Sequence, residues 1–94
     1  MPKSKPGIAM QSKVKVDRVQ TGVMLEKRML KVLKAVAEYH DISLGELLEG
    51  VILHAFDGAC AFGKPSLKLI SELKKLYHLD LDSRASHRLT DQKG

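Results

Sequence analysis

The chain has 94 residues, of which 44% are hydrophobic, 29% charged and only 4% aromatic, with a net charge of +5 and one cysteine. This composition excludes wholesale disorder, and a lone Cys60 excludes an intramolecular disulfide, so we expect one small cytoplasmic domain with an aliphatic core and an inert, reduced thiol. No apolar run is long enough to cross a bilayer, and no signal peptide is expected because no apolar segment follows the basic N-terminus.

Residues 1–16 are predicted to form a flexible arm, because they are rich in Lys, Ser, Pro and Gly and show little periodicity. Most of the net charge lies in this region. Such a concentration of positive charge suits an anionic partner, most often nucleic acid, although a solubilising tail explains it equally well. The cations of residues 1–18, set against the single acid Asp17, are Lys3, Lys5, Lys13, Lys15 and Arg18.

Period-two alternation predicts a β-strand over residues 18–25. Alternation with β-branched residues is typical of a strand that buries one face. One face would hold Val19, Thr21, Val23 and Leu25, and the other Arg18, Gln20, Gly22 and Met24. A single strand leaves its backbone N–H and C=O groups without partners, so we expect a second copy of the chain to supply the matching strand.

Two helices are predicted next, over residues 26–39 and from Ser43 to about residue 56. Ser43 is a typical N-cap, and Glu46 completes a capping box that defines the start of the second helix. In the first helix, apolar residues recur at the spacing of an amphipathic helix. They are Met29, Leu30, Leu33, Val36 and Ala37.

Residues 58–78 are predicted to contain a linker and then a third helix over about residues 67–78, which Ser66 would cap. Residues 79–94 are expected to be a polar tail that frays. The third helix has an apolar face, and two interpretations remain open. It either packs on its own domain or binds a second protein.

The order of strand, helix and helix in residues 17–57 resembles the ribbon-helix-helix superfamily of Arc-like and methionine-repressor-like DNA-binding proteins. The resemblance rests on the hydrophobic pattern of residues 18–56, on Ala37-Glu38 near the end of the first helix and on Ser43 at the second N-cap. It implies a mainly α homodimer with an intermolecular two-stranded antiparallel ribbon and an extra C-terminal helix. The implied function is sequence-selective transcriptional regulation, of the repressor or antitoxin type, on double-stranded DNA.

The resemblance also implies which residues contact DNA. The ribbon would enter the major groove and read bases through Arg18, Gln20, Gly22 and Met24, with Arg18 suited to guanine and Gln20 to adenine. Gly22 and Met24 depart from the polar pattern that the superfamily usually has there. The alternative function is therefore a dimeric protein-interaction module of the same fold that does not read DNA.

A second DNA contact is implied at the N-terminus of the second helix, where free N–H groups can hold a phosphate. A capping box that only stabilises the helix is the other interpretation of this site. The predicted phosphate ligands are Ser43, Leu44, Gly45, Lys13, Lys15, Lys27 and Arg28, whereas Lys31 and Lys34 are expected to form a solvated face.

No catalytic or metal-binding pattern emerges from the remaining residues. The histidines do not pair at helical spacing, and no glycine-rich phosphate loop is present. We therefore expect no enzyme activity, no metal and no cofactor. The histidines, which we expect to be structural or solvated, are His40, His54, His78 and His87.

Overall fold

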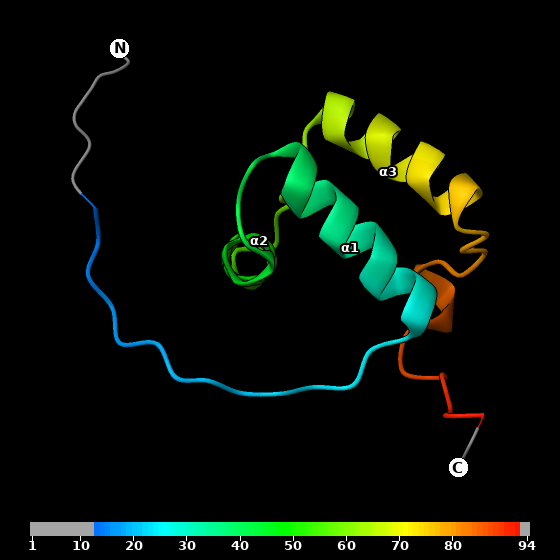
Figure 1. Ribbon diagram of the computed structural model, residues 1–94, viewed down its shortest axis with the longest axis horizontal. Helices are drawn as coiled ribbons and strands as arrows, with labels where there is room; N and C mark the ends of the chain where they lie inside the picture. Colours follow the sequence, from blue (N-terminus) through cyan, green and yellow to red (C-terminus); the bar gives the residue numbers. More distant parts are fainter. Residues whose placement is uncertain (1–12, 93–94) are drawn as a thin grey trace.

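The computed structural model describes residues 13–92, which form three α-helices and one short 3₁₀ helix (Figure 1). α1 lies between α2 and α3 and contacts both of them. Residues 13–26 run as an extended segment, called here the N-terminal segment, which joins the start of α1. The helices are α1 (Lys27–Tyr39), α2 (Leu44–Phe56), α3 (Lys64–Leu76) and the 3₁₀ helix η1 (Ser83–Ala85).

α1 confirms the amphipathic helix that its periodicity predicts. Glu26 caps it, because its carboxylate accepts a hydrogen bond of 2.9 Å from the backbone N–H of Met29. The helix ends where Asp41 adopts a left-handed conformation with φ of 57°, which Asp tolerates better than most residues. The N–H of Ile42 then donates to the carbonyl of Ala37 at 3.0 Å, a bond that closes the last turn.

α2 begins at the predicted capping box. The Ser43 hydroxyl accepts from the Glu46 N–H at 3.1 Å, and the Glu46 carboxylate accepts from the Ser43 N–H at 3.0 Å. This reciprocal pair satisfies two donors that a helix start would otherwise leave unpaired. The helix ends before Gly58, whose φ of 73° suits a residue without Cβ.

The core is small and centred on α1. Its buried side chains are Val32, Val36, Ala37 and Leu47, and Val36 is the most deeply buried at 1% exposure. Both neighbouring helices pack against it, so the predicted aliphatic core is confirmed. The half-buried apolar residues around it are Leu33, Val51, Phe62, Ile70, Leu73, Tyr77 and Leu79.

The predicted strand over residues 18–25 is wrong, and with it the ribbon-helix-helix fold and its intermolecular ribbon. Within residues 13–92 the structure contains helices but no β-strand. The N-terminal segment is extended, yet no other part of residues 13–92 pairs with its backbone. Its apolar side chains face solvent, with Val19 83% and Val23 73% exposed. Alternation implies a half-buried strand only where one face is covered and the backbone has a partner, and neither condition holds here. The mainly α part of the prediction is confirmed.

α3 begins at Lys64 rather than near residue 67, and Gly63 rather than Ser66 occupies the N-cap position. Pro65 lies in its first turn, where the N–H that proline lacks is not needed. The Ser66 hydroxyl instead lies 3.1 Å from Nε2 of His40 and so joins α3 to the end of α1.

Residues 79–92, called here the C-terminal segment, pack on the helices rather than fray. Leu79 lies against the core. Arg28 of α1 holds the start of the segment, because its guanidinium donates to the carbonyl of His78 at 2.7 Å and contacts the Asp80 carboxylate at 3.3 Å. α3 itself contacts α1, with Ile70 and Leu73 against the core, so the third helix packs on its own domain, one of the two interpretations that the sequence leaves open.

Candidate nucleic-acid interface

Arg18, the first predicted base-reading residue, is bound to a carboxylate of α2. Its Nε lies 2.8 Å from one oxygen of Glu49 and its Nη2 lies 2.7 Å from the other. The hydrogen bonds from Arg18 lower the pKa of Glu49, and the same bonds raise the pKa of Arg18, so both groups stay charged. This bidentate pair ties the N-terminal segment to α2.

The other predicted base-reading residues, Gln20, Gly22 and Met24, lie exposed along the same segment. Met24 is 87% exposed, and a Cβ built on Gly22 would meet nothing within 4 Å. The structure therefore brings Arg18 to α2 but leaves the other three residues apart from the helices. Nothing in the surroundings of Gly22 requires a glycine.

The N-terminus of α2 has donors left for an anion. The capping box occupies the N–H groups of Ser43 and Glu46, while those of Leu44 and Gly45 form no hydrogen bond with the part of the chain that the structure describes. A Cβ built on Gly45 would have only the Ser43 hydroxyl nearby, at 3.9 Å, so the backbone is open to approach. This geometry suits a phosphate at the positive end of the helix dipole.

Two carboxylates lie near this helix end, and only that of Glu46 opposes an anion. Glu46 remains charged because hydrogen bonds from Ser43 lower its pKa. Glu49, one turn further on, is neutralised by Arg18. The site is therefore favourable through its backbone and unfavourable through Glu46, and an anion there depends on additional cations.

Arg28, a predicted phosphate ligand, is used inside the protein. Besides its bonds to the C-terminal segment, it pairs with Glu26 at 3.0 Å. These contacts anchor the first turn of α1. The neighbouring Lys27 is exposed and remains the cation at this helix start that can reach an external partner.

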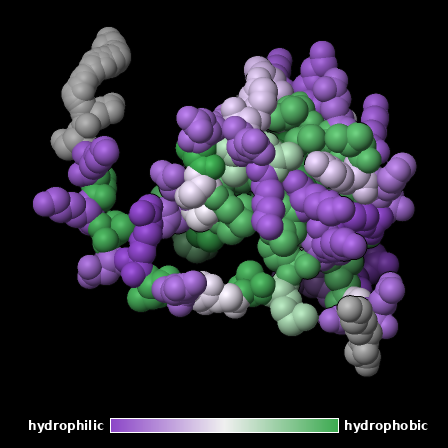
Figure 2. All heavy atoms as spheres, viewed as in Figure 1, coloured by the Kyte–Doolittle hydropathy of each residue, from purple (hydrophilic) through white to green (hydrophobic). Residues whose placement is uncertain are grey.

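The lysines differ from the arginines in their pairing. Across residues 13–92, Arg18, Arg28 and Arg84 each pair with a carboxylate, whereas no lysine does. Figure 2 shows hydrophilic side chains along the N-terminal segment and over the outer surface of the helices. The exposed lysines of the segment and of α1 are Lys13, Lys15, Lys27, Lys31 and Lys34.

The described residues contain no cluster of side chains suited to hold a metal ion. Between residues 13 and 92, no group of three or more His, Cys, Asp or Glu side chains converges as a metal site would require. Cys60 is exposed, and Nδ1 of His54 lies 2.7 Å from the carbonyl of Gly50 in its own helix. None of the described helices has the length and apolar character needed to traverse a membrane.

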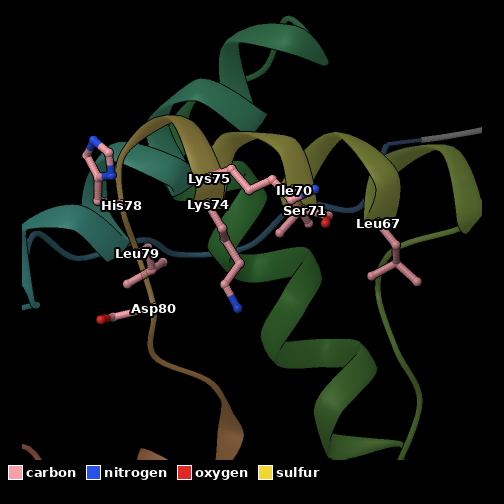
Figure 3. A pocket seen from close by; sticks show the side chains of 8 residues that line it. All are labelled: Leu67, Ile70, Ser71, Lys74, Lys75, His78, Leu79 and Asp80. Atoms are coloured by element: carbon pink, nitrogen blue, oxygen red, sulfur yellow. The ribbon is translucent and has the colours of Figure 1, made fainter.

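Two hollows lie beside α3. The first, of about 720 Å³, is a shallow depression along α3 from Leu67 to Lys75, with further side chains from residues 78–80 (Figure 3). The second, of about 440 Å³, lies between α1, α3 and the C-terminal segment. Lys74 lines both. The sequence contains no local signal for the second hollow, because residues far apart in the chain form its walls.

A scan against protein-family models gives no match, and searches of curated proteins and of solved structures also give none. Function is therefore inferred from the chemistry of the described residues.

Proposed function

We propose that the chain is a cytoplasmic regulator, not an enzyme, that binds double-stranded DNA, with its lysines against the phosphate backbone. The observation that carries the proposal is a difference between the two kinds of cation within residues 13–92. Three of the four arginines pair with carboxylates and the fourth, Arg88, donates to the carbonyl of Arg84, whereas no lysine pairs with a carboxylate. An unpaired, exposed ammonium group can replace a condensed counterion on DNA without first breaking an internal ion pair.

The unpaired lysines that we assign to DNA lie on two consecutive parts of the chain, the N-terminal segment and α1. Lys13 and Lys15 lie on the N-terminal segment, and Lys27 lies where that segment joins α1. Lys31 and Lys34 lie exposed further along α1, and the Lys31 ammonium also lies 5.8 Å from the centre of the Tyr77 ring. From Lys27 to Lys34 the helix rises about 10 Å. One strand of B-DNA carries a phosphate about every 3.4 Å of axis, so this stretch spans several phosphates.

Sequence selectivity in this proposal comes from the N-terminal segment. Gln20 is exposed and can pair with adenine, whereas Arg18 must exchange Glu49 for a guanine. Gly22 has no side chain for such a contact, and Met24 offers apolar contact with a thymine methyl group. Removal of the Glu49 carboxylate would therefore release Arg18 for DNA.

The test is fluorescence anisotropy of a labelled duplex, titrated at several salt concentrations. For the double variant Lys13→Gln/Lys15→Gln we expect weaker binding and a log–log salt slope that is smaller by about 2. The matched control is Lys64→Gln/Lys68→Gln, which removes two exposed lysines of α3, a helix on the other side of α1 from the N-terminal segment (Figure 1). No binding by the wild-type chain at low salt, or equal losses for both double variants, would contradict the proposal.

A second candidate function, a protein-interaction module, is favoured by apolar surface on α2 and the N-terminal segment. Leu53 and Phe56 of α2 are 64% and 80% exposed. Val19, Val23 and Met24 are also exposed, on the N-terminal segment. Contiguous apolar residues at a surface mark interaction sites. In this alternative a second copy of the chain covers them, and the chain acts through association rather than through DNA.

Sedimentation at micromolar concentration distinguishes this candidate. We expect a dimer that Leu53→Ser/Phe56→Ser converts to a monomer. Leu76→Ser, which changes a residue of α3 that is 65% exposed, should leave the dimer intact. A wild-type chain that sediments as a monomer would exclude self-association.

A further inference from the structure

We propose that the hollow between α1, α3 and the C-terminal segment binds an amphipathic carboxylate, with an apolar chain inside and an anionic head beside Lys74. The hollow has a volume of about 440 Å³, within the range typical of ligand pockets. It is separate from the exposed apolar surface of α2 and from the N-terminal segment, so the proposal does not rest on DNA binding.

The walls of the hollow are mainly apolar and come from four parts of the chain. α1 contributes the side of its apolar face that includes Met29, Leu33 and Val36. The loop before α3 contributes Phe62, and α3 contributes Ile70. Because Val36 is fully buried, the hollow reaches the core, where an apolar chain is removed from water. The C-terminal segment closes the other side with Leu79, Leu81, Ala85 and Leu89.

The size of the hollow limits the ligand. A methylene group takes up about as much space as a water molecule in the liquid, roughly 30 Å³, so a hollow of about 440 Å³ holds at most about fifteen such groups. A fatty acid of about ten to twelve carbon atoms, with its two carboxylate oxygens, stays within that limit. A longer chain would have to displace the C-terminal segment. Medium-chain fatty acids therefore represent the ligand class in both length and charge.

The positive charge of Lys74 favours a ligand whose head group is negatively charged. It is half-buried, whereas the other lysines within residues 13–92 are exposed, and it pairs with no carboxylate. Asp82 is the acid that lines the hollow, and Arg84 already binds it at 2.7 Å. Hydrogen bonds from Arg84, with a smaller contribution from the charge of Lys74, lower the pKa of Asp82. The Asp82–Arg84 pair is neutral as a whole, so the charge of Lys74 is left for a ligand carboxylate.

Other polar groups at the hollow suit the same head group. Ser83, Ser86 and His87 line it on the side of the C-terminal segment. Hydroxyl groups can donate to a carboxylate, and an imidazole N–H can do the same. A cationic ligand would meet Lys74 instead, so the arrangement favours an anion.

The experiment is an NMR titration of the ¹⁵N-labelled full chain with decanoate, with 1-decanol as the uncharged probe of equal length. We expect saturable shifts at amides that line the hollow, such as Leu33, Ile70 and Ala85. Lys74→Gln should weaken decanoate binding by about tenfold, as expected for the loss of a charge-assisted hydrogen bond, and leave 1-decanol binding within about twofold. The matched control is Lys75→Gln, the neighbouring exposed lysine, which lines only the shallower depression.

The proposal is overturned if decanoate gives no saturable shift or if the shifts centre on α2. It is also overturned if the lysine variants at positions 74 and 75 lose decanoate binding equally, because that result would indicate attraction to net charge alone. Ala85→Phe, which fills the hollow, should abolish binding of both probes. The dispersion of its NMR spectrum shows whether the variant is folded, and a folded variant that still binds both probes contradicts the site.

Discussion

Val36→Ala is expected to be strongly destabilising, because Val36 is the most deeply buried side chain of a very small core. The substitution removes two methyl groups. At about 0.8 kcal/mol each, their transfer to water costs about 1.6 kcal/mol. The incomplete collapse of the surrounding side chains adds a cavity cost, which raises the total to about 2–3 kcal/mol.

The position of Val36 narrows this range. One side of the residue lines the hollow beside α3, so some of its contacts are already missing and the cost lies near the lower value. A chain of this length has a free energy of unfolding of about 5–14 kcal/mol. The expected loss is therefore a substantial fraction of the total, and it corresponds to a fall in Tm of about 10–20 °C.

The measurement is urea denaturation and thermal unfolding, both followed by circular dichroism at one fixed protein concentration, since self-association would shift the apparent stability. The control is Val14→Ala, which makes the same chemical change at a residue that is 85% exposed. We expect the control to change the free energy of unfolding by less than about 0.5 kcal/mol. Equal effects of the two substitutions, or a loss below about 0.5 kcal/mol for Val36→Ala, would refute the placement of the core.

Two further predictions concern the charged and capping groups of the helices. Ser43→Ala should cost about 1 kcal/mol in urea denaturation, because it removes the N-cap acceptor of α2, and Ser43→Asp should restore most of that loss. Acid should destabilise the fold, because hydrogen bonds from Arg18 and Ser43 hold the pKa values of Glu49 and Glu46 below 4.5. These carboxylates contribute stability above their unfolded pKa and lose it as the pH falls through the lower folded pKa. Tm should therefore fall below about pH 4.5 in the wild-type chain and fall less in Glu49→Gln, and equal acid sensitivity of the two would count against the Arg18–Glu49 pair.

Local signals in the sequence were sufficient to locate the first two helices. The apolar spacing of α1 reflects contacts on one face of one helix, and the capping box of α2 involves residues three positions apart. Both patterns are complete within a few residues, so they do not depend on the rest of the fold. The start of α3 differs from the expected position near residue 67 because a proline such as Pro65 is typical of a linker and is also accepted in the first turn of a helix.

Whether residues 18–25 form a strand could not be decided from local signals in the same way. Alternation in residues 18–25 describes only the direction of successive side chains in an extended chain. A strand also needs a partner backbone, and whether one is present depends on segments far away in the sequence or on another molecule. In the structure the long-range contact of this region is the ion pair between Arg18 and Glu49. Hydrophobic patterning contains no information about that contact, and the resemblance implied only a DNA contact for Arg18.

The partners of the remaining cations depend on the surroundings of each residue as well as on its type. Arg28 and Lys27 are adjacent and were both predicted to contact phosphate, yet Arg28 turns inward to Glu26 and Asp80 while Lys27 stays exposed. A guanidinium can hold two carboxylates and a carbonyl at once, so it is favoured for internal contacts between distant segments. An ammonium group is more strongly hydrated and loses more on burial, so it tends to remain at the surface. The same reasoning makes half-buried Lys74 the exception, and it is the lysine for which an anionic ligand is proposed.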